Sequence, residues 1–323
     1  MRPPFPHGTV TDPRDASLDG VLVVDKPAGP TSHDVVALAR RCLRERRIGH
    51  TGTLDPLATG VLPLACGRAT RLVRFLTGST KDYEATIRFG VTTDSYDVTG
   101  SETGGTGRCP TVADVERALP SLRGAYLQEP PPFSAKQVAG RRAYALARRQ
   151  EAVTLPPVQV QVADAALVRL DGAAGTFRIT CSAGFYVRAF AHALGQIVGT
   201  GACLEALRRT RSGEFGLTRA VTAEALQADP AGVLARLTPM NDLLPDLPFV
   251  QLTDEGRDRV AHGRTIEARH AVTGLAEAAG VAPGDRDGDP ARWVRMLDRE
   301  GRLMAVGRPE GSPIALHPSI VLT

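Results

Sequence analysis

A single carboxylate, Asp55, stands among small residues in the stretch GHTGTLDPLATG, residues 49–60. Glycines let a substrate approach the backbone closely, and Pro56 restricts the conformation beside the acid. A carboxylate held in this way could act as a nucleophile if a cationic side chain kept it ionised. However, Asp before Pro is also typical of a plain turn. The loop alone therefore leaves a structural role and a chemical role open.

Arg188 is one candidate for the cationic partner. It lies in GFYVRAFAHALG, where a strand is expected to give way to a helix. The chain is so rich in arginine that residue type alone does not select Arg188. Lysines, by contrast, occur only at Lys26, Lys81 and Lys136. Lysine is a compact point charge, so its retention in an arginine-rich chain favours function at those positions.

Several common chemistries lack their signature residues in this sequence. The phosphate-binding patterns GxxxxGK[ST] and GxGxxG are absent, and so are the zinc-binding spacings of histidine and the GxSxG pattern of serine hydrolases. The five cysteines are widely separated and include no CxxC pair, which argues against disulfides and structural zinc. We therefore expect no metal and no cofactor.

The charge distribution favours a polyanionic partner. The net charge is only +4, yet arginines gather in three clusters, at 40–47, at 141–149 and at 208–211. Such clusters suit phosphate contacts to nucleic acid, although each could equally be a solvated helix face. The N-terminus lacks the apolar core of a signal peptide, and no apolar run reaches the roughly 20 residues that span a bilayer. A cytoplasmic protein without membrane contact is expected.

Hydrophobic periodicity predicts a mixed α+β chain. The expected strands cover 20–25, 60–66, 83–91, 158–162, 176–184 and 319–323, with a hairpin near 292–308. The expected helices begin at Thr31 or Ser32 and at Thr111, contain Leu72 to Leu76, and cover 186–198, 222–237 and 254–262. Residues 100–110 are expected to form a loop.

A composition change near 243–249 predicts a domain boundary. We expect a flexible tail at 1–18, a main domain with a mixed, mainly antiparallel sheet at 19–245, and a small β-barrel-like domain at 246–323. An acidic, glycine-rich insertion at 281–290 suggests no role.

Six segments in order resemble the successive motifs of one family, the bacterial TruB tRNA pseudouridine-55 synthases. They are GVLVVDKPAGPTSHDVV, GHTGTLDPLATGVLPLACGRATR, KDYEATIRFGVTTDSYDVTG, PPPFSAKQVAGRRAYALAR, GFYVRAFAHALG and ACLEALRRTRSGEF, and together they cover residues 19–220. The resemblance implies a catalytic domain of the pseudouridine synthase type, an RNA-binding arm near 131–150 and a C-terminal PUA-like RNA-binding domain. Gln137 departs from the lysine of many members, which implies a weaker RNA contact there.

The resemblance also implies roles for single residues. Asp55 matches the catalytic aspartate, Arg188 the arginine that pairs with it, and Tyr83 the tyrosine that stacks on the flipped base. Binding and supporting roles fall to His50 (RNA loop), Tyr186 and Leu207 (uridine pocket), and Lys26 and Pro27 (support of the active-site loop). Without the resemblance, Tyr83 and Leu207 would be core residues, His50 a loop histidine and Tyr186 a packing residue.

Two acids in the third motif, Asp94 and Asp97, are interpreted as turn formers, and no role is assigned to His33, His192 or Cys66.

The implied function is the isomerisation of uridine to pseudouridine at position 55 in the T-loop of tRNA, by base flipping and without a cofactor. The partner would be the T-arm and elbow of tRNA, with no obligate protein partner and a monomeric enzyme. A tRNA-folding chaperone is the alternative from the binding class, and the two roles could coexist. A carboxylate-nucleophile phosphotransferase would instead require an acidic metal cluster beside Asp55.

Overall fold

The computed structural model describes residues 18–132, 137–138, 141–142, 156–272, 278, 293–310 and 315–323 of the 323-residue chain. Three expectations concern segments outside the described residues. They are those for the tail before residue 18, for most of the 131–150 arm with its arginine cluster and Gln137 side chain, and for the 281–290 insertion. None of the helices in the described ranges is long and apolar enough to cross a bilayer.

An eleven-stranded, mainly antiparallel sheet forms the body of the molecule, as the sequence predicts. Its main path has the order β14-β1-β3-β12-β4-β11-β10-β7, and only β1 with β14 and β3 with β12 run parallel. The strands on this path are β1 (Gly20–Lys26), β3 (Thr59–Cys66), β4 (Lys81–Phe89), β7 (Gly124–Gln128), β10 (Val158–Asp171), β11 (Ala174–Cys181), β12 (Ala202–Ser212) and β14 (Val221–Thr222). Three short strands pair beside it: β2 (Ile48–His50), β13 (Phe215–Gly216) and β15 (Thr238–Pro239).

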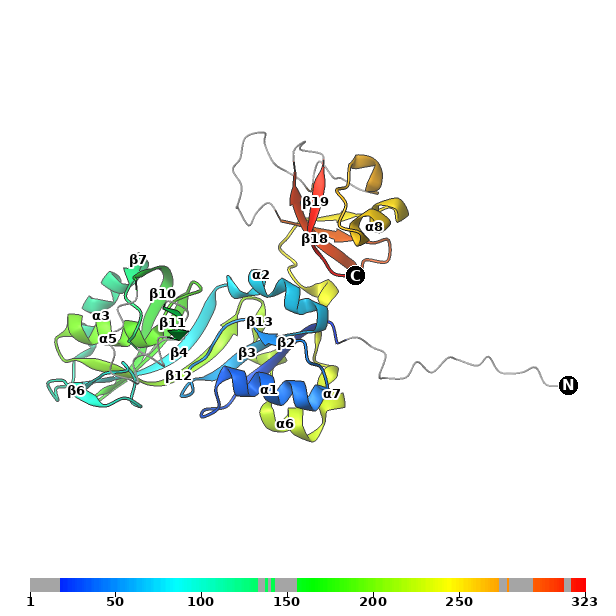
Figure 1. Ribbon diagram of the computed structural model, residues 1–323. Coiled ribbons are helices and arrows are strands. Elements are labelled where there is room, and N and C mark those ends of the chain that lie inside the picture. Colours follow the sequence, from blue (N-terminus) through cyan, green and yellow to red (C-terminus); the bar gives the residue numbers. More distant parts are fainter. Residues whose placement is uncertain are drawn as a thin grey trace.

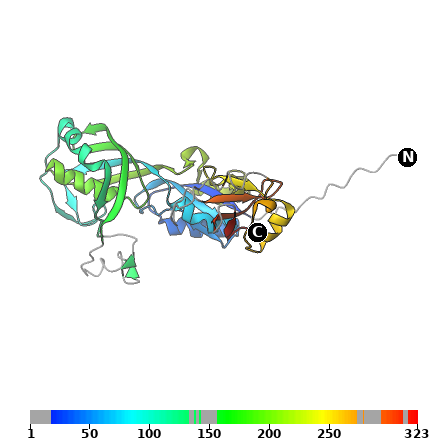
Figure 2. The same cartoon turned by 90° about the horizontal axis from the view of Figure 1, so that it is seen from above.

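The helices form two groups at opposite ends of this sheet (Figure 1). One group contains α3 (Val112–Ala118) and α5 (Val187–Val198), and the other contains α1 (Ser32–Leu43), α6 (Ala223–Ala228) and α7 (Pro230–Leu234). The long strands β4 and β12 run between the two groups (Figure 2). A side chain that leaves the middle of either strand can therefore meet residues from both ends.

Local sequence explains the most regular elements. β4 alternates buried and half-buried or exposed positions along KDYEATIRF, as expected for a strand with one face in the core. α1 begins with a capping box, in which Thr31 accepts from the Asp34 amide and Asp34 accepts from the Thr31 amide. α3 begins in the same way at Thr111 and Asp114. The expected helix around Leu72 to Leu76 is split into a 3₁₀ turn, Gly67–Leu72, and α2, Val73–Thr77.

The central strand β12 is the main element that sequence analysis did not predict. Its sequence, ACLEALRRTRS, lacks a period of two, because the pairing with β4 shifts register between Leu204 and Ala206 and again between Arg209 and Arg211. Irregular pairing of this kind re-aims side chains and erases the alternation that marks a strand. Within the expected 100–110 loop, residues Glu102–Gly104 form β6, which pairs with β5 (Thr92–Thr93).

The C-terminal part contains a four-stranded sheet in the order β16-β17-β18-β19 with α8 (Asp254–Ala261) beside it. The strands are β16 (Phe249–Gln251), β17 (Val294–Leu297), β18 (Leu303–Pro309) and β19 (Leu316–Val321), and β17 with β18 form the expected hairpin. In the described part of the chain this sheet is open rather than closed into a barrel. β8 (Gln137–Val138) and β9 (Arg141–Arg142) form a separate two-stranded hairpin.

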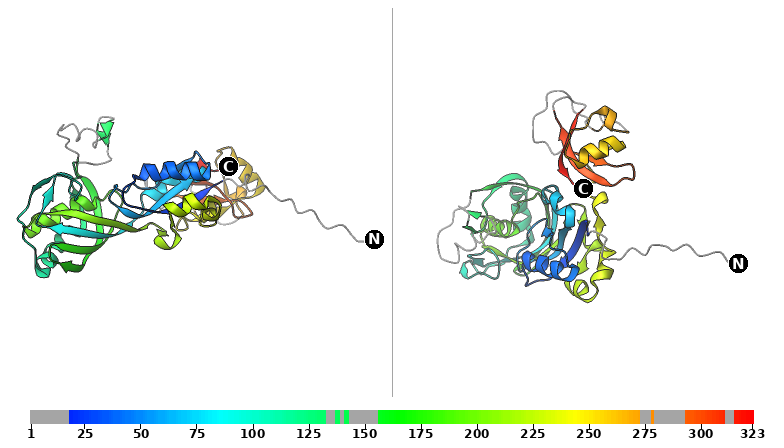
Figure 3. Two further views of the ribbon diagram at one scale, coloured as in Figure 1. Left: turned by 90° about the horizontal axis from the view of Figure 1, so that it is seen from below. Right: turned by 45° about the vertical axis from the view of Figure 1, so that its right-hand side comes forward.

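A shared apolar cluster joins the C-terminal sheet to the large one. Val21 and Val23 of β1 pack in one cluster with Trp293, Leu303 and Ile320. Accordingly, Figure 3 shows the C-terminal sheet beside α2 and the β1 end of the large sheet. β1 is therefore buried on both faces, which accounts for its continuous apolar sequence.

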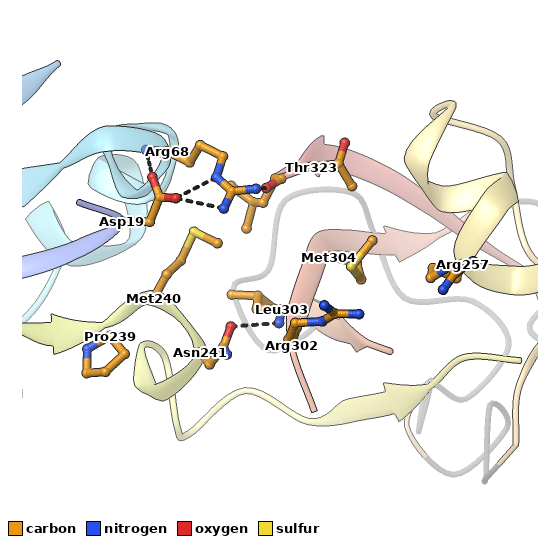
Figure 4. A pocket seen from close by; sticks show the side chains of 11 residues that line it. Asp19, Arg68, Pro239, Met240, Asn241, Arg257, Arg302, Leu303, Met304 and Thr323 are labelled. Atoms are coloured by element: carbon orange, nitrogen blue, oxygen red, sulfur yellow. Dashed lines mark hydrogen bonds and ion pairs between the residues drawn. The ribbon is translucent and has the colours of Figure 1, made fainter. Parts of the chain in front are cut away.

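A pocket of about 600 Å³ lies along this junction (Figure 4). Arg68 crosses it, pairing with Asp19 at 2.7 Å and donating to the Leu322 carbonyl at 2.8 Å. The Leu303 amide donates to the Asn241 side chain at 2.9 Å. None of the site residues predicted from the sequence lines this pocket, so its polar contacts are those of a domain joint.

Gly60 at the start of β3 provides a test of the central packing. Its φ is +100°, and a Cβ atom there would lie 2.2 Å from the Arg209 carbonyl oxygen. We predict that Gly60→Ala lowers the free energy of unfolding by about 2 kcal/mol or more, measured by urea denaturation. Gly78→Ala is the matched control, because Gly78 has φ of −71° and a Cβ atom there would lie 4.0 Å from the Phe75 carbonyl oxygen. Equal effects of the two changes would contradict the close approach of β3 and β12.

Candidate active site

Asp55 and Arg188, 133 positions apart, form a bidentate ion pair. Arg188 Nε donates to Asp55 Oδ2 at 2.9 Å, and Nη2 donates to Oδ1 at 3.2 Å. The arginine side chain is 6% exposed, whereas that of the aspartate is 35% exposed. Such paired, charge-assisted hydrogen bonds stabilise the anion and fix its orientation. The carboxylate is thus held from its buried side and remains open to a substrate on the other.

A second carboxylate, Asp97, stands behind Arg188. Its Oδ2 lies 3.6 Å from Arg188 Nε, and its side chain is only 6% exposed. The other oxygen, Oδ1, accepts from Ser95 Oγ and from the Thr99 amide, both at 2.9 Å. Arg188 Nη1 also donates to the Ser95 carbonyl at 2.9 Å. The turn that contains Asp97 therefore holds the arginine in place.

The sequence indicates only a turn-forming role for Asp97, and that interpretation is incomplete. Asp97 does form the turn, but it also faces the guanidinium that pairs with Asp55. The motif TDSYDVTG contains two acids, and only the fold distinguishes Asp97 from Asp94, whose Oδ1 accepts from the Ser101 amide. Tyr96, in the left-handed region at φ of +64°, shapes the turn between Ser95 and Asp97.

The backbone after Asp55 is fixed by groups from β1 and α1. Lys26 is fully buried, and its Nζ donates to the carbonyls of Pro27, Pro56 and Ala58 at 2.9, 3.2 and 2.7 Å. Burial is the largest cause that lowers the pKa of Lys26 to about 8; the nearby Arg209 acts in the same direction and Asp55 opposes it. Lys26 thus ties the main chain after Asp55 to the end of β1, and Pro27 contributes one of the acceptor carbonyls.

Ser32 holds the residue just before Asp55. Its hydroxyl accepts from the Leu54 amide at 2.8 Å and donates to the Leu54 carbonyl at 3.1 Å. The Gly29 amide adds a bond to the Pro56 carbonyl at 2.8 Å. These contacts act on the main chain, so both carboxylate oxygens of Asp55 remain available to Arg188 and to a substrate.

Tyr83 and Leu207 lie on neighbouring strands at the centre of the sheet, exposed by only 9% and 7%. Tyr83 is opposite Arg209, and Leu207 is opposite Ala85, which places these side chains on one face. Burial raises the pKa of the Tyr83 hydroxyl and the nearby Asp55 raises it further, whereas Arg209 lowers it. The tyrosine is therefore a neutral, largely buried ring within the electrostatic reach of Asp55.

The two remaining predicted residues are Tyr186 and His50. Tyr186 is the N-cap of α5. The side-chain amide of the buried Gln128 binds its main chain: it accepts from the Tyr186 amide at 2.8 Å and donates to the Tyr186 carbonyl at 3.0 Å. His50 is half-buried on β2, and its Nδ1 has no hydrogen-bond partner among the described residues. Burial, followed by Arg209 and His33, lowers the pKa of His50, so its ring is neutral at pH 7.

The arginine cluster at 208–211 lies on β12, so the alternative of a solvated helix face is wrong for it. Two of its members pair with acids: Arg208 with Asp25 at 2.7 Å and Arg211 with Asp82 at 2.6 Å. The third, Arg209, is buried. In the first cluster, Arg40 donates to the Ile48 carbonyl, whereas Arg41, Arg44 and Arg46 are exposed. The acidic metal cluster of a phosphotransferase is not found among the described residues.

Comparison with known proteins identifies the relatives of this chain. A family model for the N-terminal domain of TruB family pseudouridylate synthases matches residues 40–187, and a model for the C-terminal domain of tRNA pseudouridylate synthase B matches residues 188–244. The tRNA pseudouridine synthase B of Solibacter usitatus is 42% identical over 308 residues, which covers 94% of this chain and 100% of the relative. That of Syntrophus aciditrophicus is 39% identical, covering 90% and 91% of the two chains.

Two solved structures also align with most of this chain. The chain aligns with a structure of the archaeal box H/ACA sRNP Nop10–Cbf5 complex at a TM-score of 0.69 and 26% identity, covering 97% of this chain and 89% of the other. A Cbf5–Nop10–Gar1 complex aligns at a TM-score of 0.70 and 25% identity, covering 97% and 88%.

Proposed function

The chain belongs to the TruB family of pseudouridine synthases, and we propose that it converts the uridine at position 55, in the T-loop of tRNA, to pseudouridine. The observation that carries this proposal is the bidentate pair of Asp55 and Arg188 on a loop whose main chain is held from both sides. The two relatives named above carry the activity in their names and match nearly the whole chain, which supports tRNA as the substrate.

We propose Asp55 as the nucleophile. In this isomerisation the bond from uracil N1 to ribose C1′ breaks, the base turns, C5 bonds to C1′, and the proton on C5 is lost while N1 gains one. No atom or electron is added overall, so the protein needs to supply only a nucleophile, orientation and proton transfer. Arg188 stabilises the ionised carboxylate that attack requires, whether on the base or on the ribose.

The target base must leave its stack in the RNA before Asp55 can reach it. Tyr83 is proposed as the ring that receives the base, with Leu207 and Tyr186 lining the pocket around it. Stacking on an aromatic side chain contributes about 1–3 kcal/mol per base, which offsets much of the cost of unstacking. We propose that the neutral ring of His50 contacts the rearranged loop.

Sequence-independent affinity would come from phosphate contacts. Arg41, Arg44 and Arg46 are exposed near the end of α1 and are proposed to meet the tRNA backbone, which makes binding sensitive to salt. We further propose that 19–245 is the catalytic domain and 246–323 a PUA-like RNA-binding domain, and that the enzyme acts as a cytoplasmic monomer. A chaperone that had lost catalysis would have no need of the intact Asp55–Arg188 pair, although an added chaperone role is compatible with it.

The direct test uses an unmodified tRNA transcript that carries tritium on C5 of its uridines. The wild-type protein should release tritium from the T-loop uridine without added metal, since C5 loses its hydrogen when it bonds to C1′. Asp55→Asn should release none, while its dissociation constant for tRNA, measured by filter binding, stays within about twofold of the wild-type value. Tight binding without release from the wild type would indicate a chaperone instead, and a tenfold loss of binding by Asp55→Asn would contradict the proposed division of roles.

A second prediction concerns Asp97. Asp97→Asn removes the charge behind Arg188 with little change in shape, so the guanidinium is less firmly placed beside Asp55. The single-turnover rate should fall by at least about tenfold, or roughly 1.4 kcal/mol, with tRNA affinity retained. Asp94→Asn is the control from the same turn, because the Asp94 carboxylate accepts only from the Ser101 amide in the described contacts. If both variants turn over at the same rate, Asp97 has no specific part in holding Arg188.

A further inference from the structure

We infer that Arg209 is a positioning residue, whose buried guanidinium fixes the backbone ahead of Asp55 and holds Tyr83 in register with it. The inference deepens the proposed function and rests on it for its activity measurement. Arg209 belongs to the cluster that the sequence offered for phosphate contacts, yet it is 1% exposed and cannot meet a phosphate where it lies.

The guanidinium bridges a strand and the loop that carries the nucleophile. Nε donates to the Val61 carbonyl in β3 at 2.7 Å. Nη2 donates to the Gly52 carbonyl at 3.0 Å, and Nη1 to the Thr53 carbonyl at 3.4 Å. A planar fork with five N–H groups can serve these diverging acceptors at once, whereas an ammonium on a single stem cannot. The residues just before Leu54 and Asp55 are thereby tied to the sheet.

Gly60 makes room for the strand that carries Arg209. β12 and β3 run parallel with Arg209 paired to Gly60, where a Cβ atom would meet the Arg209 carbonyl at 2.2 Å. At Gly52 a Cβ atom would lie 3.6 Å from Arg209 Nη1, an ordinary van der Waals contact. Gly60 is therefore needed for the approach of the Arg209 main chain to β3, in addition to any approach of a substrate.

The same guanidinium reaches the aromatic residue of the site. Tyr83 on β4 is directly opposite Arg209 on β12, so both side chains leave the sheet on one face. Burial raises the pKa of the Tyr83 hydroxyl, and the charge of Arg209 lowers it. One buried group thus binds the Asp55 loop and lies beside the proposed base platform, which relates the positions of the two.

Arg209 also differs from its neighbours in having no carboxylate partner among the described ion pairs. Arg208 and Arg211 are 39% and 43% exposed and pair with acids. A buried cation bound only by carbonyls is costly unless its hydrogen bonds are well satisfied. Among the described ion pairs, Asp55 is bound by Arg188. Burial lowers the pKa of Lys81 to about 8, and the charge of Arg209 acts in the same direction.

The test compares three variants of the full-length protein: Arg209→Met, Arg209→Lys and, as the control, Arg211→Met from the same strand. Misplacing a catalytic group by about 1 Å can slow a reaction by roughly 100-fold, so Arg209→Met should lose about that much in single-turnover tritium release. Its tRNA dissociation constant should stay within about twofold of wild type. Arg209→Lys keeps the charge but loses the fork, and should also be slower by about tenfold or more. Arg211→Met should keep the wild-type rate.

Chemical rescue separates positioning from a general loss of stability. Millimolar guanidinium added to Arg209→Ala should restore part of the rate without changing its thermal midpoint, while sodium chloride at equal ionic strength should not. A wild-type rate in Arg209→Lys would overturn the inference even if Arg209→Met failed to fold, and so would an equal loss in Arg211→Met. If the wild type itself releases no tritium, the proposed function fails; release by the wild type with unaffected Arg209 variants overturns only the inference.

Discussion

The ion pair between Asp55 and Arg188 is the contact on which the rest of the site depends. It joins the loop before β3 to the first turn of α5, two elements from different ends of the sheet. The loop is held through its main chain by Lys26 and Ser32 on one side and by Arg209 on the other. None of these three groups hydrogen-bonds to the Asp55 carboxylate in the described contacts. The protein therefore positions Asp55, the proposed nucleophile, without a further ion pair that would neutralise its charge.

Other charged side chains surround this pair. Asp97 forms a second ion pair with Arg188. Lys26, Lys81 and Arg209 are buried near the loop and are bound largely by carbonyl oxygens. Burial of such cations costs free energy, so stability does not explain them. An orientation that exists before the substrate arrives does explain them, because preorganised groups need no rearrangement during the reaction.

Much of the frame could be predicted from local sequence. β1, the capped start of α1, the alternation of β4 and the start of α5 near Tyr186 follow from apolar periodicity and capping residues. Asp55 could be singled out as a candidate, but composition did not separate a turn from a nucleophile. The family resemblance made that choice, and the bidentate contact with Arg188 agrees with it.

The parts that could not be predicted depend on contacts between distant segments. Two register shifts remove the alternation that would identify β12 as a strand. In the sequence, Arg209 is one of three neighbouring arginines and nothing marks it as buried. Asp97 looks like its neighbour Asp94 until α5 brings Arg188 to it. In each case the residue type is visible in the sequence, while its partner comes from a strand or helix far away in the chain.

Hydrogen exchange of the free protein tests the central claim, that the Asp55 loop is organised before RNA binds. The amides of Thr51, Leu54 and Ala58 donate to the Pro63 carbonyl, the Ser32 hydroxyl and the Asp55 carbonyl. They should exchange slowly in the absence of tRNA, as slowly as the amides of β3, and should change little when tRNA is added. Fast exchange that becomes slow only with tRNA would show that the RNA, and not the buried cations, organises the loop.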